Sequence, residues 1–133
     1  ELSAAVSASP IDKGKVATIA ASLLQTIDDL DRILATHTGF MVGTWINEAR
    51  AWGTTEAESD HYEWSARNQI TLWGPSGRQG TVDYATKGWS GVTKTYYRER
   101  WALFLKTLQA SADGVVDQVA FNAAVLAQVE QPW

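Results

Sequence analysis

The sequence contains no cysteine, only three prolines and no long apolar run. The absence of cysteine excludes a disulfide framework, a thiolate metal site and a cysteine nucleophile. The prolines are Pro10, Pro75 and Pro132, so long stretches remain in which helices can form without interruption. A membrane-spanning helix needs about 20 consecutive apolar residues. We therefore expect no membrane span and no membrane partner.

Positive charge is also scarce. Lysine and arginine number 11, aspartate and glutamate number 15, and the net charge is -4. An acidic chain without a cluster of basic residues is poorly suited to phosphate backbones, so we expect no nucleic-acid partner. The 133 residues are 45% hydrophobic, which is typical of one globular domain. The chain starts at Glu1 without methionine or a signal segment, which suggests a piece of a larger polypeptide.

Apolar residues recur at steps of three and four along most of the chain, which predicts helices. Ser9 and Pro10 suit the start of the first helix, while Thr55 and Glu58 have the spacing of a capping box. The pattern predicts five helices. Four of them cover residues 11–36, 40–52, 56–71 and 82–110, and the fifth includes Val119, Leu126 and Val129 and ends at about residue 130. A loop rich in glycine and proline is expected over residues 73–81. The predicted fold class is an all-α bundle.

The polar residues offer little evidence of catalysis. Acidic clusters occur at 28–31 and 56–63, and we interpret both as solvated helix faces. Glu63 and Arg67 have the spacing of an ordinary exposed ion pair. His37 and His61 lie in different segments without a metal-binding pattern, so we predict no metal site and no cofactor. The segment 77–80 is glycine-rich but lacks the flanking signals of a phosphate-binding loop. No catalytic residue is predicted.

Seven tryptophans are unusually many for a chain of this length. Four of them fall on helical stripes and are predicted to pack in the core: Trp45, Trp52, Trp89 and Trp101. Trp64 lies three residues before Arg67 and is predicted to stack on it. Trp73 differs because it opens the loop, where an indole face can stack on a sugar ring. From the residues alone, plain packing remains the favoured interpretation of Trp73.

Several strings resemble the α-N-acetylglucosaminidases, glycoside hydrolase family 89. They cover roughly residues 38–108. The strings are Phe40-Met41-Val42-Gly43-Thr44-Trp45-Ile46-Asn47-Glu48-Ala49-Arg50-Ala51, then Arg67-Asn68-Gln69-Ile70-Thr71-Leu72-Trp73-Gly74-Pro75, then Asp83-Tyr84-Ala85 and Arg100-Trp101. The loop between Gly77 and Asp83 is about two residues longer than the form typical of the family, so the tip from Arg78 to Thr81 is not compared residue by residue.

The resemblance implies that residues 1–133 are the C-terminal all-helical domain of a larger glycoside hydrolase, whose (β/α)8 barrel is absent here. The family removes terminal α-linked N-acetylglucosamine, as in heparan sulfate, with retention. Retaining enzymes use two carboxylates about 5–5.5 Å apart, and the resemblance places both on the barrel. It implies that Trp73 and Tyr84 face the substrate pocket, with Arg67 bracing the Trp73 loop through Glu63 or backbone carbonyls. It also implies a secreted, periplasmic or lysosomal parent protein.

Two other classes remain open at this stage. One is a stand-alone carbohydrate-binding module, and the other is a helical protein-interaction domain without a ligand. We expect the isolated chain not to hydrolyse α-N-acetylglucosaminides. We also expect it to expose an apolar face that contacts the barrel in the intact enzyme.

Overall fold

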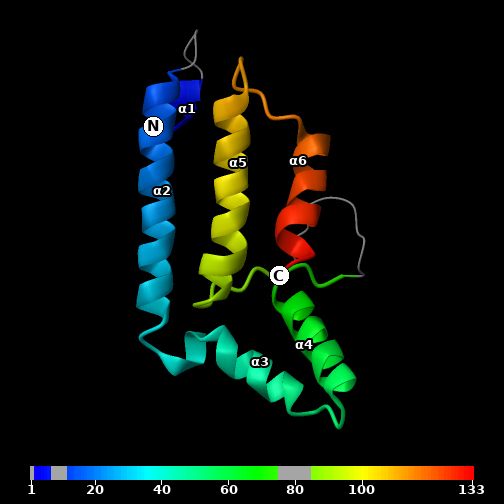
Figure 1. Cartoon of the computed structure of the whole chain (residues 1–133). Helices are drawn as coiled ribbons and strands as arrows, with labels where there is room; N and C mark the ends of the chain where they lie inside the picture. Colours follow the sequence, from blue (N-terminus) through cyan, green and yellow to red (C-terminus); the bar gives the residue numbers. More distant parts are fainter. Residues whose placement is uncertain (1, 7–11, 75–84) are drawn as a thin grey trace.

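A computed structural model describes residues 2–6, 12–74 and 85–133 (Figure 1). The predicted all-α fold is confirmed, and the described residues form no strand beyond an isolated bridge between Met41 and Ser90. The elements are α1 (Leu2–Val6), α2 (Lys13–Leu34), η1 (Thr38–Phe40), α3 (Val42–Arg50), α4 (Glu56–Ile70), η2 (Thr93–Tyr97), α5 (Arg98–Ala110), α6 (Gln118–Val125) and η3 (Leu126–Glu130). Within the described ranges, no helix is long and apolar enough to cross a membrane.

The three helices α2, α5 and α6 stand side by side in Figure 1, and α1 lies against the start of α2. Helix α3 crosses one end of this layer and leads through a short turn into α4, which packs on α3. The chain ends between η3 and α4. This arrangement places the C-terminus of α4 beside the last residues of the chain.

Side-chain caps define where the helices start. The Asp12 carboxylate accepts a hydrogen bond from the Lys15 amide at 2.9 Å and caps α2, which starts at Lys13. The predicted cap Ser9 and the predicted first helical residue Pro10 lie outside the described residues. The capping prediction for α4 is confirmed, because the Thr55 hydroxyl accepts from the Glu58 amide.

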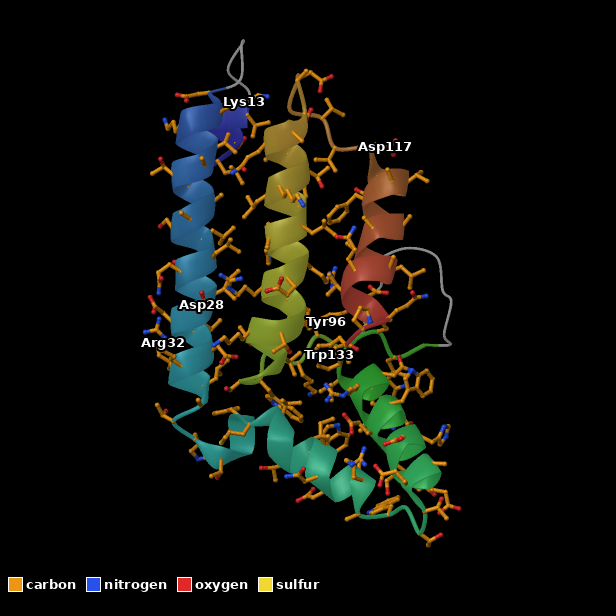
Figure 2. All side chains as sticks on the ribbon, viewed as in Figure 1. Lys13, Asp28, Arg32, Tyr96, Asp117 and Trp133 are labelled. Atoms are coloured by element: carbon orange, nitrogen blue, oxygen red, sulfur yellow. The ribbon has the colours of Figure 1, made fainter. Side chains whose placement is uncertain are left out.

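Two apolar clusters form the core of the part of the chain that the structure describes. The larger one holds Ile70, Val92, Tyr96 and Val129, which join α4, the start of η2 and η3. Figure 2 shows Tyr96 and Trp133 close together at the centre of the molecule, where their ring centroids lie 5.1 Å apart. The smaller cluster joins α1, α2 and α5 through residues 5, 16 and 108. The larger cluster therefore fixes α4 against the C-terminus.

The predicted helix over 82–110 is wrong in its first part. Residues 85–90 are not helical, residues 82–84 lie outside the described chain, and regular helix runs only from Val92 through η2 and α5. Gly91 has a φ of 91°, a conformation that L-residues rarely adopt and that stops the helix from extending backward. The apolar stripe that includes Ala85 and Trp89 gave no signal of this break.

Three side chains are placed differently from the sequence prediction. Asp31 was expected on a solvated face but is only 8% exposed. Trp52 and Trp101 were expected in the core but are 76% and 45% exposed. Trp45 and Trp89 are partly buried, as expected, and meet edge to face with ring centroids 6.1 Å apart. Helical spacing thus identified a shared stripe but not how far that stripe is covered.

Candidate functional site

The backbone after α4 turns sharply and holds Trp73 at the surface. Thr71 leaves the helix, and its hydroxyl donates to the Arg67 carbonyl at 2.9 Å. Trp73 then has a φ of 46°, which is uncommon for a residue with a large side chain. Its side chain is 59% exposed. The turn therefore presents the indole outward on a backbone in a costly conformation.

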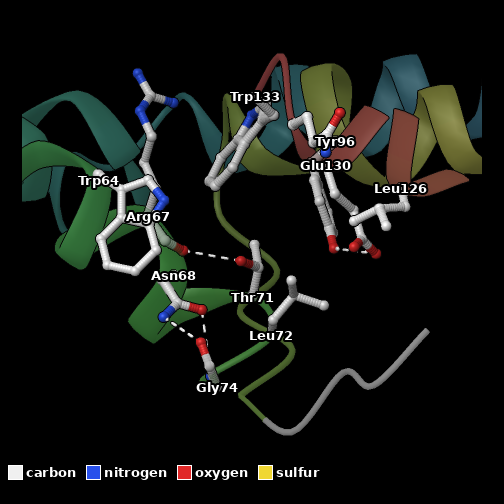
Figure 3. Close-up of a pocket in the computed structure, with 11 residues that line it drawn as sticks. Trp64, Arg67, Asn68, Thr71, Leu72, Gly74, Tyr96, Leu126, Glu130 and Trp133 are labelled. Atoms are coloured by element: carbon white, nitrogen blue, oxygen red, sulfur yellow. Dashed lines mark hydrogen bonds between the residues drawn. The ribbon is translucent and has the colours of Figure 1, made fainter. Parts of the chain in front are cut away.

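Asn68 holds this turn in place. The Trp73 amide donates to the Asn68 carbonyl at 2.7 Å. The Asn68 side chain donates to the Gly74 carbonyl at 2.7 Å and accepts from the Gly74 amide at 3.3 Å (Figure 3). Asn68 thus makes three hydrogen bonds to backbone groups of Trp73 and Gly74, which restrain the backbone at these two residues.

The returning chain ties down the far side of the loop. The Ala85 amide donates to the Thr71 carbonyl at 3.3 Å, and the Lys87 amide donates to the Ile70 carbonyl at 3.1 Å. These bonds close the base of the loop predicted over 73–81. The loop beyond Gly74, with the predicted site residue Tyr84, lies outside the described residues.

A pocket of about 240 Å³ lies beside this turn, between α4 and the end of the chain (Figure 3). Residues from α4 and the turn form one side of it, and Tyr96 and the C-terminal residues form the other. Its lining is Trp64, Arg67, Asn68, Thr71, Leu72, Gly74, Tyr96, Leu126, Glu130, Gln131 and Trp133. Leu72 and Gly74 line the pocket, whereas Trp73, which stands between them in sequence, is not among the lining residues.

Arg67 lies in this pocket between an acid and an aromatic ring. Its Nε and one Nη donate to Glu63 Oε1 at 2.8 and 2.6 Å, so the predicted pair forms, but it is partly buried and not exposed as expected. The guanidinium carbon lies 4.9 Å from the centroid of the Trp133 ring. The predicted stack of Trp64 on Arg67 is wrong: Trp64 stacks on His61, with ring centroids 6.1 Å apart. Arg67 thus joins α4 to the C-terminus.

The carboxylates near the site are held by arginines. Asp60 and Glu63 each place an oxygen 2.7 Å from one Nη of Arg50, and Glu56 pairs with the other Nη. Hydrogen bonds from Arg67, then from Arg50, hold the pKa of Glu63 below its usual value. A general acid needs a raised pKa to carry a proton near neutrality. Glu63 is therefore an ionised structural partner, unsuited to the role of a proton donor.

No group of three histidine, aspartate or glutamate side chains able to hold a metal is found in the part of the chain that the structure describes. His37 instead accepts a hydrogen bond from the Gly39 amide at 3.1 Å. This bond helps to shape the short turn η1.

Sequence reasoning singled out Trp73, Arg67 and the partner Glu63, but it missed Asn68 and Trp133. Asn68 stands five residues before Trp73, and its role depends on a backbone turn that no periodicity encodes. Trp133 lies 66 positions after Arg67, so only the tertiary fold brings the two together. One local signal was present in the sequence. A threonine inside a helix commonly donates its hydroxyl to the carbonyl four residues earlier, and Thr71 makes this bond to Arg67.

Comparison with known proteins agrees with this architecture. All 133 residues match the family described as Alpha-N-acetylglucosaminidase (NAGLU) C-terminal domain. The chain is also 44% identical over 93 residues to human alpha-N-acetylglucosaminidase, a match that covers 70% of this chain and 12% of the human protein. The chain therefore belongs to the family of C-terminal domains of α-N-acetylglucosaminidases.

Proposed function

We propose that this domain packs on the catalytic domain of the same polypeptide and helps to form the pocket that hydrolyses terminal α-linked N-acetylglucosamine. The observation that carries the proposal is the position of Trp73, exposed at the surface yet restrained by Asn68. A ring carried on a restrained backbone loses less entropy when a ligand stacks on it than a ring on a loose chain. The family membership supplies the class of enzyme.

The proposed roles differ from residue to residue. Trp73 offers its indole face to the apolar face of a sugar ring. Tyr84 donates a hydrogen bond to a sugar hydroxyl or supports a catalytic carboxylate, as the resemblance to glycoside hydrolase family 89 implies. Arg67 acts through position: it links Glu63 to Trp133 and keeps the base of the Trp73 turn in place.

The catalytic carboxylates are proposed to lie on the catalytic domain, outside this chain. Retention requires a nucleophile and an acid/base about 5–5.5 Å apart. Asp60 and Glu63 are close enough to share one nitrogen of Arg50, but hydrogen bonds from Arg67 and then Arg50 hold the pKa of Glu63 below its usual value. The chain alone is therefore proposed to be inactive, and the natural substrate is proposed to be a glycan such as heparan sulfate.

The proposal is tested by Trp73→Ala in the full-length enzyme that contains this domain. Losing one stacking face should cost on the order of 1–3 kcal/mol of transition-state binding, a fall of roughly tenfold to a hundredfold in kcat/KM. The measurement is kcat/KM on an aryl α-N-acetylglucosaminide together with Tm.

Trp101→Ala is the matched control, because Trp101 is also a half-exposed tryptophan but lies on α5. We expect this variant to keep its kcat/KM. Normal kcat/KM in Trp73→Ala, beside a stability loss of about 3–5 kcal/mol as for a core residue, would contradict the proposal.

A further inference from the structure

A second groove lies between α3 and α4, on the other side of α4 from the pocket described above. Its volume is about 320 Å³. The lining residues come from α3, the turn after it and α4, and they are Trp45, Glu48, Ala49, Trp52, Tyr62, Ser65, Ala66 and Gln69. A volume of this size is within the range of small-ligand sites.

Two exposed aromatic rings form a corner in this groove. Trp52 is 76% exposed and Tyr62 is 37% exposed, and their ring centroids lie 6.2 Å apart at an interplanar angle of 70°. Trp45 forms the inner wall, and its indole N–H donates to the Ala66 carbonyl at 3.0 Å. The corner therefore offers two apolar ring faces at a steep angle, which suits a non-planar ring with apolar C–H groups.

The turn that carries Trp52 is held rigidly. The Ser59 hydroxyl donates to the Arg50 carbonyl at 3.0 Å, and Arg50 pairs with three carboxylates of α4. A Cβ at Gly53 would lie 2.4 Å from the Ser59 amide nitrogen, so only glycine allows this close approach. Trp52 thus stands on an anchored turn, and its exposure is not the result of a loose end.

The polar groups of the groove have hydrogen-bonding capacity to spare. Within the described residues, neither Glu48 nor Gln69 makes a side-chain hydrogen bond or ion pair, and both are exposed. The Gln69 amide provides two donors and an acceptor, and the Glu48 carboxylate accepts from hydroxyls. Glu48 is the one charged residue among those lining the groove. An uncharged ligand rich in hydroxyl or acetamido groups fits this set, whereas a sulfate or uronate would face a negative charge.

We propose that the groove between α3 and α4 binds a neutral pyranose ring, as a glycan site separate from the surface that carries Trp73. The sugar stacks on the Trp52 face, its acetamido or hydroxymethyl group packs against Tyr62, and Gln69 and Glu48 bind its polar edge. The choice of a sugar rests on the proposed function, because that function makes glycans the partners of the parent enzyme. The site itself rests on the groove and does not depend on Trp73.

The test uses the full-length enzyme labelled with 5-fluorotryptophan, in which the Trp52 resonance is the one lost in Trp52→Phe. The probe is the β-linked disaccharide N,N′-diacetylchitobiose, since an α-specific hydrolase leaves β linkages intact. We expect a saturable shift of the Trp52 resonance. Gln69→Ala should raise the Kd about three- to tenfold by removing an amide contact. A sulfated, uronate-containing disaccharide should bind at least about tenfold more weakly.

Gln25→Ala is the control, because Gln25 is an exposed glutamine on α2, away from the groove. The Kd of this variant for N,N′-diacetylchitobiose should equal that of the unaltered enzyme. Trp73→Ala should leave the Trp52 titration unchanged, so a failure of this site and a failure of the Trp73 assignment give different results. The inference is overturned if the Trp52 resonance does not respond to the probe. It is also overturned if that resonance is shielded from solvent because the catalytic domain covers the groove.

Discussion

The backbone amide of Gly91 donates to the Asp31 carboxylate at 2.7 Å, across 60 positions of sequence. The same oxygen accepts from the Lys94 amide at 3.2 Å, and the second oxygen accepts from the Ser90 hydroxyl at 3.3 Å. Asp31 on α2 thus caps the helix that begins at Val92. A carboxylate at this place also interacts favourably with the helix dipole. One side chain therefore fixes where the longest helix after the loop begins.

We predict that Asp31→Ala destabilises the domain by about 2–4 kcal/mol, because several donors at the helix start lose a buried acceptor. Chemical denaturation followed by circular dichroism measures the effect. Asp29→Ala is the control: Asp29 pairs with Arg32 at the surface and should cost at most about 0.5 kcal/mol. Equal effects of the two variants would show that Asp31 is no more than another surface acid.

Gly91 should tolerate no side chain. Its φ of 91° disfavours any L-residue, and an added Cβ would lie 2.4 Å from Val42 Cγ1. We expect Gly91→Ala to cost about 2–4 kcal/mol in the free energy of unfolding. Gly43→Ala provides the contrast, since Gly43 lies inside α3 and a Cβ there meets nothing within 4 Å. That variant should gain about 0.5–1 kcal/mol. A stable Gly91→Ala variant would mean that the backbone at this position rearranges freely.

Local signals explain which parts of the fold were predictable from sequence. The apolar stripe that begins at Val16 and the cap at Thr55 lie within a few residues of what they determine, so α2 and α4 were placed nearly correctly. The start of the helix at Val92 was not predictable in this way. It depends on a contact between Asp31 and Gly91, which are far apart in sequence. Residues 85–90 have a helical pattern in the sequence, because Trp89 continues the apolar stripe. The contact of Gly91 with Asp31 is what marks the helix start after them.

The candidate site shows the same limit. Trp73 was singled out because a helix ends and a Gly/Pro loop begins there, which is a local signal. Burial was less predictable: the spacing puts Trp52 on the helix face of Trp45, yet α3 ends at Arg50, so Trp52 is exposed in the turn while Trp45 packs on Ala66. Spacing along a helix tells which residues share a face. It does not tell where the neighbouring helix stops covering that face.

The Glu63 ion pairs should make stability depend on pH. Since the pKa of Glu63 is lowered in the folded state, the unfolded chain takes up the proton first as the pH falls. The stabilisation is present above the ordinary glutamate pKa of about 4.3 and is lost as the pH falls through the lower folded value. We expect Glu63→Gln to lower Tm at pH 7. We also expect the variant to lose less Tm than the unaltered domain between about pH 5 and about pH 3, the range around the ordinary glutamate pKa.

Glu48→Gln is the control for this experiment, because Glu48 forms no ion pair within the described residues. Its Tm should follow pH as the unaltered domain does. If Glu63→Gln has the same Tm as the unaltered domain at pH 7, the contacts from Arg67 and Arg50 contribute nothing net to stability.

The last prediction concerns the support of Trp73. Asn68→Ala removes both side-chain hydrogen bonds to Gly74 but keeps the bond from the Trp73 amide to the Asn68 carbonyl. Trp73 then remains at the surface on a less ordered turn, and binding must fix its position. In the full-length enzyme we expect kcat/KM to fall about three- to tenfold, less than in Trp73→Ala. The loss of stability should be about 1–2 kcal/mol.

A double-mutant cycle separates this role from a direct contact between Asn68 and substrate. If Asn68 acts through Trp73, the double variant Asn68→Ala/Trp73→Ala should have the kcat/KM of Trp73→Ala alone. Asn47→Ala on α3 is the matched control and should leave kcat/KM unchanged, because the Asn47 side chain is exposed and lies away from the turn. Fully additive losses in the double variant would show that Asn68 acts independently of Trp73. The three hydrogen bonds from Asn68 would then be structural features of the turn without a part in placing the indole.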